Sequence, residues 1–235
     1  IQHVILCSER DAKGKLVELR DELSGSKTCV EEALIRIEID RITGLEQIKS
    51  LHGHIDAVLS EVFDAVDDYT AMLERVAAIT KSWKTKGHSH ASKEELSEAC
   101  DFMDWLASNS FTFLGYVEYD IEGKGADRVL VRQDKTALGV LKEAYRSDER
   151  VILKDVPKHT REHILEKKIF LFAKSSRRSR VHRPAYADYI VIKKFNDDGD
   201  VVGELVGDTE GPVVSGLLEG CTDGVLVPGE NGGVA

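Results

Sequence analysis

The chain has 235 residues, of which 42% are hydrophobic, and a formal net charge of −10. This apolar fraction is enough for a buried core and argues against a disordered chain. The acidity is confined to the end: residues 195–235 carry nine acidic and no basic side chains, and residues 1–194 have a net charge of −1. Neither part has the basic balance of a nucleic-acid-binding protein. No apolar run approaches the roughly 20 residues that cross a bilayer, so we expect no membrane partner either.

Two features bear on the cellular compartment. The first residues lack the basic and apolar regions of a secretory signal, and the chain does not begin with Met, which suggests a part of a longer cytoplasmic protein. The four cysteines occur singly, without the CxxC pair that would indicate zinc or redox chemistry. We therefore expect reduced thiols at Cys7, Cys29, Cys100 and Cys221.

The first 40 residues have the pattern of a small β-rich unit. Residues 3–7 are a short apolar run, residues 11–14 are a turn signal, and residues 16–19 can return as the second strand of a hairpin. Residues 34–39 alternate apolar and polar side chains, which predicts a half-buried strand.

A long helix is predicted next. Apolar residues recur mostly every three or four positions between residues 45 and 79, and the stretch contains one glycine, Gly53. A single helix of this length would span roughly 50 Å at ~1.5 Å per residue, and the stretch can also divide into two helices. A compact small domain does not need such a helix, so we expect it to join two units or to pack on a partner helix. The polar residues 84–91 are the expected linker.

The second unit is expected to begin with a helix and a strand. Ser92 and Glu95 have the spacing of a capping box, in which each side chain bonds the backbone of the other residue. Residues 111–121 are the clearest strand of the chain, and residues 128–132 can pair with it. Simple alternation would place five of its side chains on one face: Phe111, Phe113, Val117, Tyr119 and Ile121.

The remaining elements complete an α+β unit. Helices are expected at residues 137–145 and 157–166, and residues 169–173, apolar on both faces, are expected as a central strand. Residues 189–195 and 200–206 form a hairpin pattern. Together the elements predict five antiparallel strands with helices on one side. From residue 207 onwards glycines are frequent and no period of 3.6 or 2 is visible, so we expect a Gly-rich acidic tail with at most a few short strands.

The basic loop, residues 174–183, is the strongest chemical feature. Guanidinium groups bind carboxylates and phosphates in a bidentate manner, so this loop can hold an anionic metabolite or an acidic partner. The alternative is a solvated loop whose cations pair with neighbouring acids. The candidate contact residues are Arg177, Arg178, Arg180, His182 and Arg183.

Metal and catalytic motifs are weak. His52 and His54 are two positions apart on the predicted helix and therefore point apart, and His88 and His90 fall in the linker. Neither pair has a further ligand at suitable spacing. Residues 197–200 resemble a calcium loop only superficially, because the later glutamate position is not matched. The sequence has no GxGxxG after a strand, P-loop, GxSxG or HExxH.

Three stretches, taken together, resemble a known family. Residues 102–120 read FMDWLASNSFTFLGYVEYD, similar to the pattern F-x-x-W-L-x-x-x-x-F-T-F-L-G-Y-x-E-Y. Residues 179–189 read SRVHRPAYADY, similar to S-x-V-H-R-P-x-Y-x-D-Y, and residues 33–41 with the following helix resemble the segment that precedes them. In this order they are similar to the N-terminal region of the large bacterial NAD-specific glutamate dehydrogenases. After residue 204 the chain departs from the family, which continues with a strand resembling R-F-L-G-L-F.

The resemblance implies a fold and a role. The parent enzyme converts glutamate and NAD to 2-oxoglutarate, ammonia and NADH on a Rossmann-type domain far downstream. Its N-terminal region is built of ACT-like and PAS-like modules with helical connectors, which serve regulation and assembly. No catalytic, cofactor-binding or metal residue of the family maps onto this chain. The implied partners are the downstream catalytic domain, further copies in a homo-oligomer and a small anionic effector.

We therefore expect an α+β chain with two small antiparallel-sheet units, ACT-like and then PAS-like, joined by a long helix. The expected boundaries are 1–83 for the ACT-like unit with its helix, 84–91 for the linker, 92–206 for the PAS-like unit and 207–235 for the tail. The predicted function is a non-catalytic regulatory and assembly region of an NAD-dependent glutamate dehydrogenase. The alternative is a free-standing sensing module that binds an anionic metabolite at the basic loop.

Overall fold

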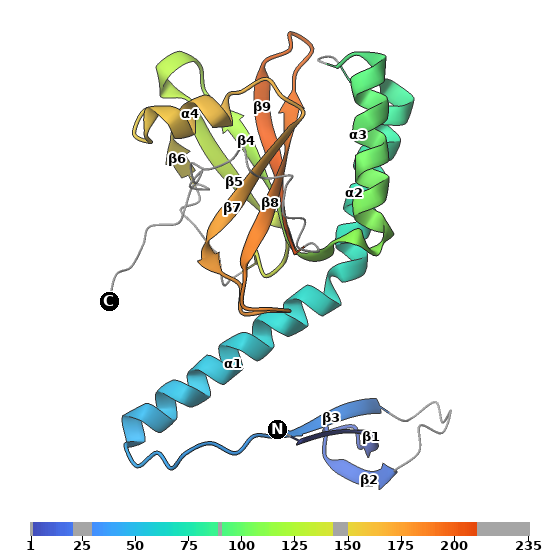
Figure 1. The fold of residues 1–235 in the computed structure, drawn as a ribbon, viewed down its shortest axis with the longest axis vertical. Coiled ribbons are helices and arrows are strands. Elements are labelled where there is room, and N and C mark those ends of the chain that lie inside the picture. The colour runs from blue at the N-terminus through green and yellow to red at the C-terminus, as the bar shows by residue number, and fades with distance from the viewer. Residues whose placement is uncertain (1, 21–29, 89–90, 143–149, 211–235) are drawn as a thin grey trace. The chain divides into compact units, whose positions relative to one another are not determined.

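The computed structural model describes residues 2–20, 30–88, 91–142 and 150–210. By its contacts the chain divides into two compact units, Ile1–His52 and Gly53–Ala235, and the division falls inside helix α1 (Leu45–Asp67). The expected linker at residues 84–91 does not coincide with this division. Helix α2 (Tyr69–Lys86), which we placed before the linker, packs on helix α3 (Lys93–Trp105) within the second unit (Figure 1).

The first unit is an antiparallel sheet in the order β2-β1-β3. Its strands are β1 (Gln2–Arg10), β2 (Leu16–Arg20) and β3 (Val30–Arg36). The predicted turn joins the first two: the Asp11 carboxylate accepts hydrogen bonds from the backbone N–H groups of Lys13 and Lys15, at 2.8 and 2.9 Å. Gly14 has a φ of 78°, which suits glycine.

Two expectations for this unit are wrong. Leu34 and Ile35 lie on opposite faces of β3 and are 64% and 54% exposed, so the strand is not half-buried, and Ile37 and Ile39 lie beyond its end. The alternation identified the strand but wrongly implied that one of its faces is covered. Cys7 is disulfide-bonded rather than reduced, with its partner outside the described residues.

The predicted long helix is two helices. Helix α1 ends at Asp67 and helix α2 begins at Tyr69, with Asp68 between them. Gly87, with a φ of 72°, follows the end of α2, and a 2.8 Å ion pair joins Lys84 to Asp104 of α3. The capping box at the start of α3 is confirmed, because Ser92 and Glu95 exchange both side-chain-to-backbone hydrogen bonds.

The second unit contains an antiparallel sheet of six strands in the order β6-β5-β4-β9-β8-β7. The strands are β4 (Thr112–Glu122), β5 (Val129–Gly139), β6 (Arg150–Ile152), β7 (Phe170–Arg178), β8 (Tyr186–Phe195) and β9 (Val201–Glu210). A π-helical turn, η1 (Leu106–Ser110), precedes β4, and a 3-10 turn, η2 (Gly125–Asp127), precedes β5. Helix α4 (Lys158–Ile164) follows β6, with Pro157 at its N-cap, and is shorter than the helix expected at residues 157–166.

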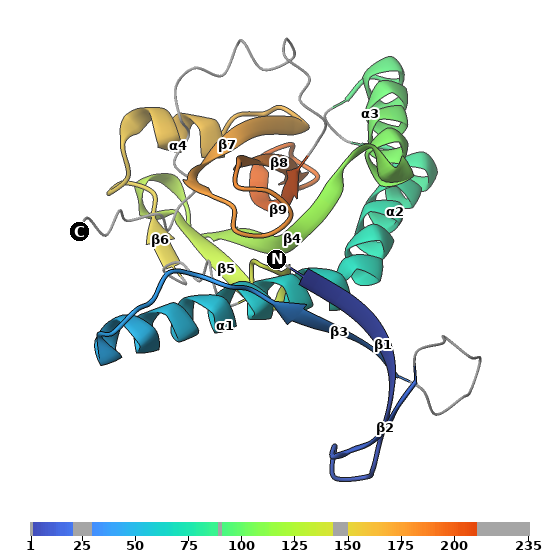
Figure 2. The ribbon, with the colours of Figure 1, turned by 60° about the horizontal axis from the view of Figure 1, so that its bottom comes forward.

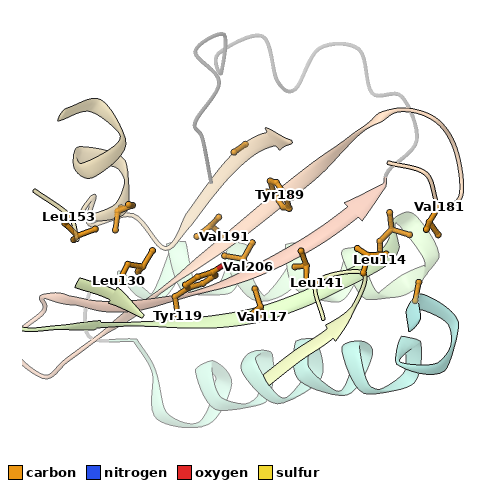
Figure 3. Close-up of a cluster of buried hydrophobic side chains, with 14 residues drawn as sticks. Leu114, Val117, Tyr119, Leu130, Leu141, Leu153, Val181, Tyr189, Val191 and Val206 are labelled. Atoms are coloured by element: carbon orange, nitrogen blue, oxygen red, sulfur yellow. The ribbon is translucent and has the colours of Figure 1, made fainter. Parts of the chain in front are cut away.

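Helices lie on both faces of this sheet, not on one face as expected. Helices α2 and α3 cover one face, and α4 lies on the other side of the strands (Figure 2). Two separate apolar clusters result. The cluster on the α4 face includes Leu114, Tyr119, Val191 and Val206, which lie along the sheet together with Val181 (Figure 3). The other cluster contains Met72, Met103, Phe113 and Ile190.

A β-bulge explains why the face assignment of β4 is wrong. Phe113 belongs to the α2/α3 cluster, whereas Val117 and Tyr119 belong to the α4 cluster. Simple alternation would have put all three on one face. The pairing of β4 with β9 shifts register between Phe113 and Gly115, and the extra residue reverses the pattern.

Three further expectations for the sheet need correction. The predicted helix at 137–145 is wrong over its described part, because β5 continues to Gly139, where a Cβ would lie 2.0 Å from the Leu114 carbonyl oxygen. Strand β7 lies at the edge of the sheet and is not central. Both of its faces are apolar because helices cover both faces of the sheet. Strand β9 continues to Glu210, so residues 207–210 of the expected tail are paired strand, and residues 211–235 lie outside the described part.

Candidate functional site

The basic loop is closed by its own backbone. The N–H of Ser179 donates to the carbonyl of Ala185 at 2.7 Å, and the Ser179 hydroxyl donates to the carbonyl of Val181 at 2.9 Å. Val181 is buried in the α4-face cluster. His182, at the tip, has a φ of 67°, the one non-glycine positive φ among the described residues. Residues 174–178 of the expected loop are therefore part of strand β7, and residues 179–185 form a tight, anchored turn between β7 and β8.

The cations of this loop contact groups of the chain itself. Lys174 Nζ lies 2.6 Å from Asp188 Oδ1, and the Arg178 guanidinium lies 5.9 Å from the centroid of the Tyr186 ring. Arg180 forms an ion pair with Glu61 of helix α1. His182 is exposed, Arg183 is half-buried, and the side chain of Arg177 lies outside the described part. The predicted contact residues thus do not converge on one point, and their role in binding an anion stays a prediction.

The partner of Arg180 is the most unusual group at this end of the molecule. Glu61 is 3% exposed although it is charged, and its Oε2 has no hydrogen-bond partner. Burying a carboxylate is unfavourable unless a cation compensates it. Arg180 supplies that compensation and thereby attaches helix α1 to the β7–β8 loop.

A second set of contacts attaches the end of α1. Asp68 Oδ2 accepts a hydrogen bond from the Gly139 N–H at 2.7 Å and forms an ion pair with Lys142 Nζ at 2.6 Å. Asp64 lies 3.6 Å from the same ammonium. The hydrogen bond to Asp68 raises the pKa of Lys142. The carboxylates of Glu61, Asp64 and Asp68 therefore attach the last two turns of α1 to the rest of the second unit.

Two polar pairs lie on the sheet, one between the neighbouring strands β8 and β9 and one within β4. Lys193 and Glu204 form a buried ion pair at 2.5 Å, and the ammonium also donates to the Ile164 carbonyl at 3.1 Å, which attaches α4. On the other face the Tyr116 hydroxyl donates to Glu118 at 2.9 Å, and burial together with this carboxylate raises the pKa of Tyr116. Both sets are satisfied within the fold.

A groove of about 350 Å³ lies between α3 and the edge strand β7. Phe102, Phe170 and Phe172 form its apolar floor, with acidic residues from α3 on one wall and Lys167 and Lys168 on the other. Lys167 already pairs with Asp200 at 3.0 Å and Lys168 with Glu166 at 2.7 Å. The groove could not be predicted from local sequence patterns, because its two sides are 60 to 80 residues apart along the chain.

The histidine pairs have separate surroundings. His52 and His54 are exposed on α1, and His88 packs edge-on against Trp83 and Phe195, with ring centroids 5.9 and 5.1 Å apart. His90 lies outside the described residues. Among the residues that the structure describes, no three His, Cys, Asp or Glu side chains are placed to hold a metal ion. In that same part of the chain, no helix has both the length and the apolar character that crossing a membrane requires.

The sequence analysis missed the carboxylates that attach α1. Glu61, Asp64 and Asp68 were not among the predicted site residues. One signal was available: Glu61 is three residues after Val58 and four before Ala65, so it interrupts the inward face of the helix. A charged residue in that position predicts a buried partner.

Residues 1–55, the three-stranded sheet and the beginning of α1, match the family described as glutamate dehydrogenase, ACT1 domain. The chain thus carries a module of the glutamate dehydrogenase class.

Two curated relatives extend this relationship along the chain. An NAD-specific glutamate dehydrogenase of Pseudomonas aeruginosa is 33% identical over 207 residues, and that of Halomonas elongata is 31% identical over 206 residues. Each alignment covers 87% of this chain but only 12% and 13% of the relative's length. The chain is therefore homologous, over most of its length, to a segment of the bacterial NAD-specific glutamate dehydrogenases, and the resemblance carried by its motifs is confirmed.

Proposed function

We propose that this chain is a non-catalytic regulatory and assembly region of a cytoplasmic NAD-dependent glutamate dehydrogenase. The first unit would be the ACT-like module, the second a PAS-like module, and helix α1 the connection between them. The parent enzyme would convert glutamate and NAD to 2-oxoglutarate, ammonia and NADH on a separate domain. Its relatives, whose names state this specificity, are about eight times longer than the aligned segment.

The observation that carries the proposal is apolar surface in the first unit. The two faces of its sheet bear Val4, Val17 and Leu34 on one side and Ile5 and Ile35 on the other, each at least 45% exposed. Monomeric proteins rarely expose contiguous apolar patches on this scale, and such patches mark interaction sites. A sheet of three strands with two apolar faces needs further layers, so this unit is suited to assembly with other protein surface.

The described residues do not fit NAD. Both sheets are antiparallel, whereas dinucleotides bind where parallel strands lead into helix N-termini. The groove beside β7 has Glu95 and Glu98 on its helical wall, and these carboxylates would repel a pyrophosphate. We infer that NAD binds the parent enzyme on another domain, and no chemical step is assigned to this chain.

The alternative function, sensing of an anionic metabolite at the basic loop, requires that an existing ion pair be broken. An anion at Arg180 or Lys174 would have to displace Glu61 or Asp188. A thermal-shift series with 2-oxoglutarate, glutamate and phosphate tests it, since a ligand of the folded state raises the melting temperature. No shift at millimolar concentrations would remove the basic loop from consideration as a sensor.

Deletion of the aligned segment from the Pseudomonas aeruginosa enzyme tests the main proposal. We expect the shortened enzyme to bind NAD with the affinity of the intact enzyme but to sediment as a smaller assembly. The chain alone should show no glutamate-dependent NAD reduction. Unchanged assembly and unchanged kinetics after the deletion would refute the proposal, and so would dehydrogenase activity of the chain that survives repurification.

A further inference from the structure

Helix α1 has two faces with different character. One face holds Glu61 and Ala65, which contact other elements of the second unit. The opposite face carries large apolar side chains that the chain leaves 42–74% exposed. We call this face the outer stripe; its apolar residues are Leu45, Ile48, Ile55, Leu59, Phe63 and Val66.

We propose that the outer stripe docks on the outer stripe of a second copy of this chain, with the two α1 helices antiparallel. This inference rests on the assembly role proposed above and names the partner of one surface. The six apolar residues and His52 occupy positions separated by three or four residues, with a mean spacing of 3.5. From Leu45 to Leu59 the steps alternate between three and four residues, as in the seam of a left-handed coiled coil, where each side chain packs between residues of the facing helix; the step of four to Phe63 departs from this heptad.

Exposure of this apolar stripe to solvent is unfavourable if the chain functions as a monomer. Helix α1 has 23 residues, about 35 Å at 1.5 Å per residue, and the stripe runs along nearly its whole length. A surface helix normally directs its apolar stripe to a core and its charges to solvent. Helix α1 directs a second apolar stripe away from the core that it already contacts.

The charges beside the stripe favour a second copy over another partner. In the antiparallel register that places Ile48 opposite Leu59 of the partner helix, His52 faces the partner's Ile55, and Phe63 and Val66 extend beyond the first residue of the partner's α1. The same register brings Lys49 opposite the partner's Asp56, because these two residues lie on one flank of the seam, one heptad apart. Two-fold symmetry makes this ion pair twice.

A parallel pair does not have this complementarity. There Lys49 would face Gly44 and Asp56 would face Leu51 of the partner helix, because flanking positions of successive heptads meet. Within one chain Lys49 pairs with Glu46 at 2.9 Å, and both side chains are more than 70% exposed. Such a surface pair contributes little, so exchanging it for an intermolecular pair is not opposed.

The test uses the full chain in sedimentation equilibrium at concentrations from one to one hundred micromolar. We expect a reversible dimer. Leu59→Glu should raise its dissociation constant at least about tenfold, because a charge would enter the apolar seam. Ser60→Glu is the matched control, since it adds the same charge one residue away, outside the stripe, and should leave the dissociation constant unchanged. The melting temperature of each variant, measured at submicromolar concentration, should equal that of the parent chain.

Charge reversal identifies the partner as the same helix. Lys49→Asp should weaken the dimer several-fold by placing two acids together, and Lys49→Asp combined with Asp56→Lys should restore it. A chain that stays monomeric at one hundred micromolar overturns the proposal, as does a double reversal that fails to restore the dimer. A lower melting temperature of monomeric Leu59→Glu would show that the same chain covers the stripe, which also overturns it. None of these outcomes depends on the enzyme deletion, so failure here leaves the assembly role itself to that experiment.

Discussion

Removal of the Arg180 guanidinium should destabilise the second unit, because the Glu61 carboxylate would remain buried without a compensating charge. The Glu61 side chain is 4% exposed and Arg180 is 42% exposed. Removing one partner of a fully buried pair costs about 3–5 kcal/mol. Solvent already screens the exposed half of Arg180, so we expect Arg180→Ala to lower the free energy of unfolding by about 1–3 kcal/mol.

The double variant separates a buried charge from lost packing. Glu61→Met combined with Arg180→Ala removes both charges and keeps apolar bulk on α1. Replacing a buried ion pair by apolar side chains is often neutral, so this variant should regain at least half of the loss. Arg178→Ala is the control on the same loop: its guanidinium lies over Tyr186, and an exposed contact of this kind contributes about 0.5–1 kcal/mol.

Urea unfolding followed by the fluorescence of the two tryptophans gives these differences as shifts in midpoint at constant slope. Equal stability of the Arg180→Ala and Arg178→Ala variants would refute the reasoning. A double variant no more stable than Arg180→Ala alone would show that packing, not charge, holds the loop. If Arg180→Ala left stability unchanged and abolished a ligand-induced thermal shift, Arg180 would be a binding residue.

Three further predictions follow from the same structure. Val62→Asp should lower the melting temperature and cost more than about 2 kcal/mol, because it would place a charge against the apolar α4-face cluster on which Val62 packs. Ending the chain after Val206 should destabilise it more than ending it after Glu210, because residues 207–210 pair with both β4 and β8; equal stability in urea would contradict this. The backbone hydrogen bond from Ser92 lowers the pKa of Glu95, so the capping contribution is complete above the ordinary carboxyl pKa and is lost as the pH falls through the lower folded value. Glu95→Gln keeps the cap without titrating and should flatten this part of the acid-unfolding curve; an unchanged pH dependence would exclude Glu95 as its source.

Local signals in the sequence predicted the elements whose causes are local. The capping box at Ser92, the turn at Asp11 and the hairpin around Asn196 each depend on residues within four positions of one another. Their hydrogen bonds are therefore readable from spacing alone. The break between α1 and α2 at Asp68 was open as a possibility, but the apolar period continues across it and does not locate it.

Elements that depend on distant partners were predicted poorly. The face assignment of β4 failed because one bulge opposite β9, some 90 residues later, reverses the alternation after Phe113. The continuation of β5 to Gly139 was hidden because it depends on the close approach of the Leu114 carbonyl. Strand β7 reads as central because both of its faces are apolar, yet coverage by helices on both faces produces the same pattern at an edge.

The basic loop shows why charge clusters in a sequence are ambiguous. Its cations look like an anion site because they are adjacent along the chain, but folding brings Asp188 from the next strand to Lys174 and Glu61 from a helix 119 residues earlier to Arg180. The buried carboxylate selects the cation, since leaving Glu61 unpaired would cost more than Arg180 gains from solvent. By the same reasoning the apolar residues of α1 are ambiguous: Val62 faces the core and Phe63 faces outward, although one period predicts both. In each case the role of a side chain depends on which group folding or assembly brings next to it. For the outer stripe, the charge-reversal experiment identifies that group.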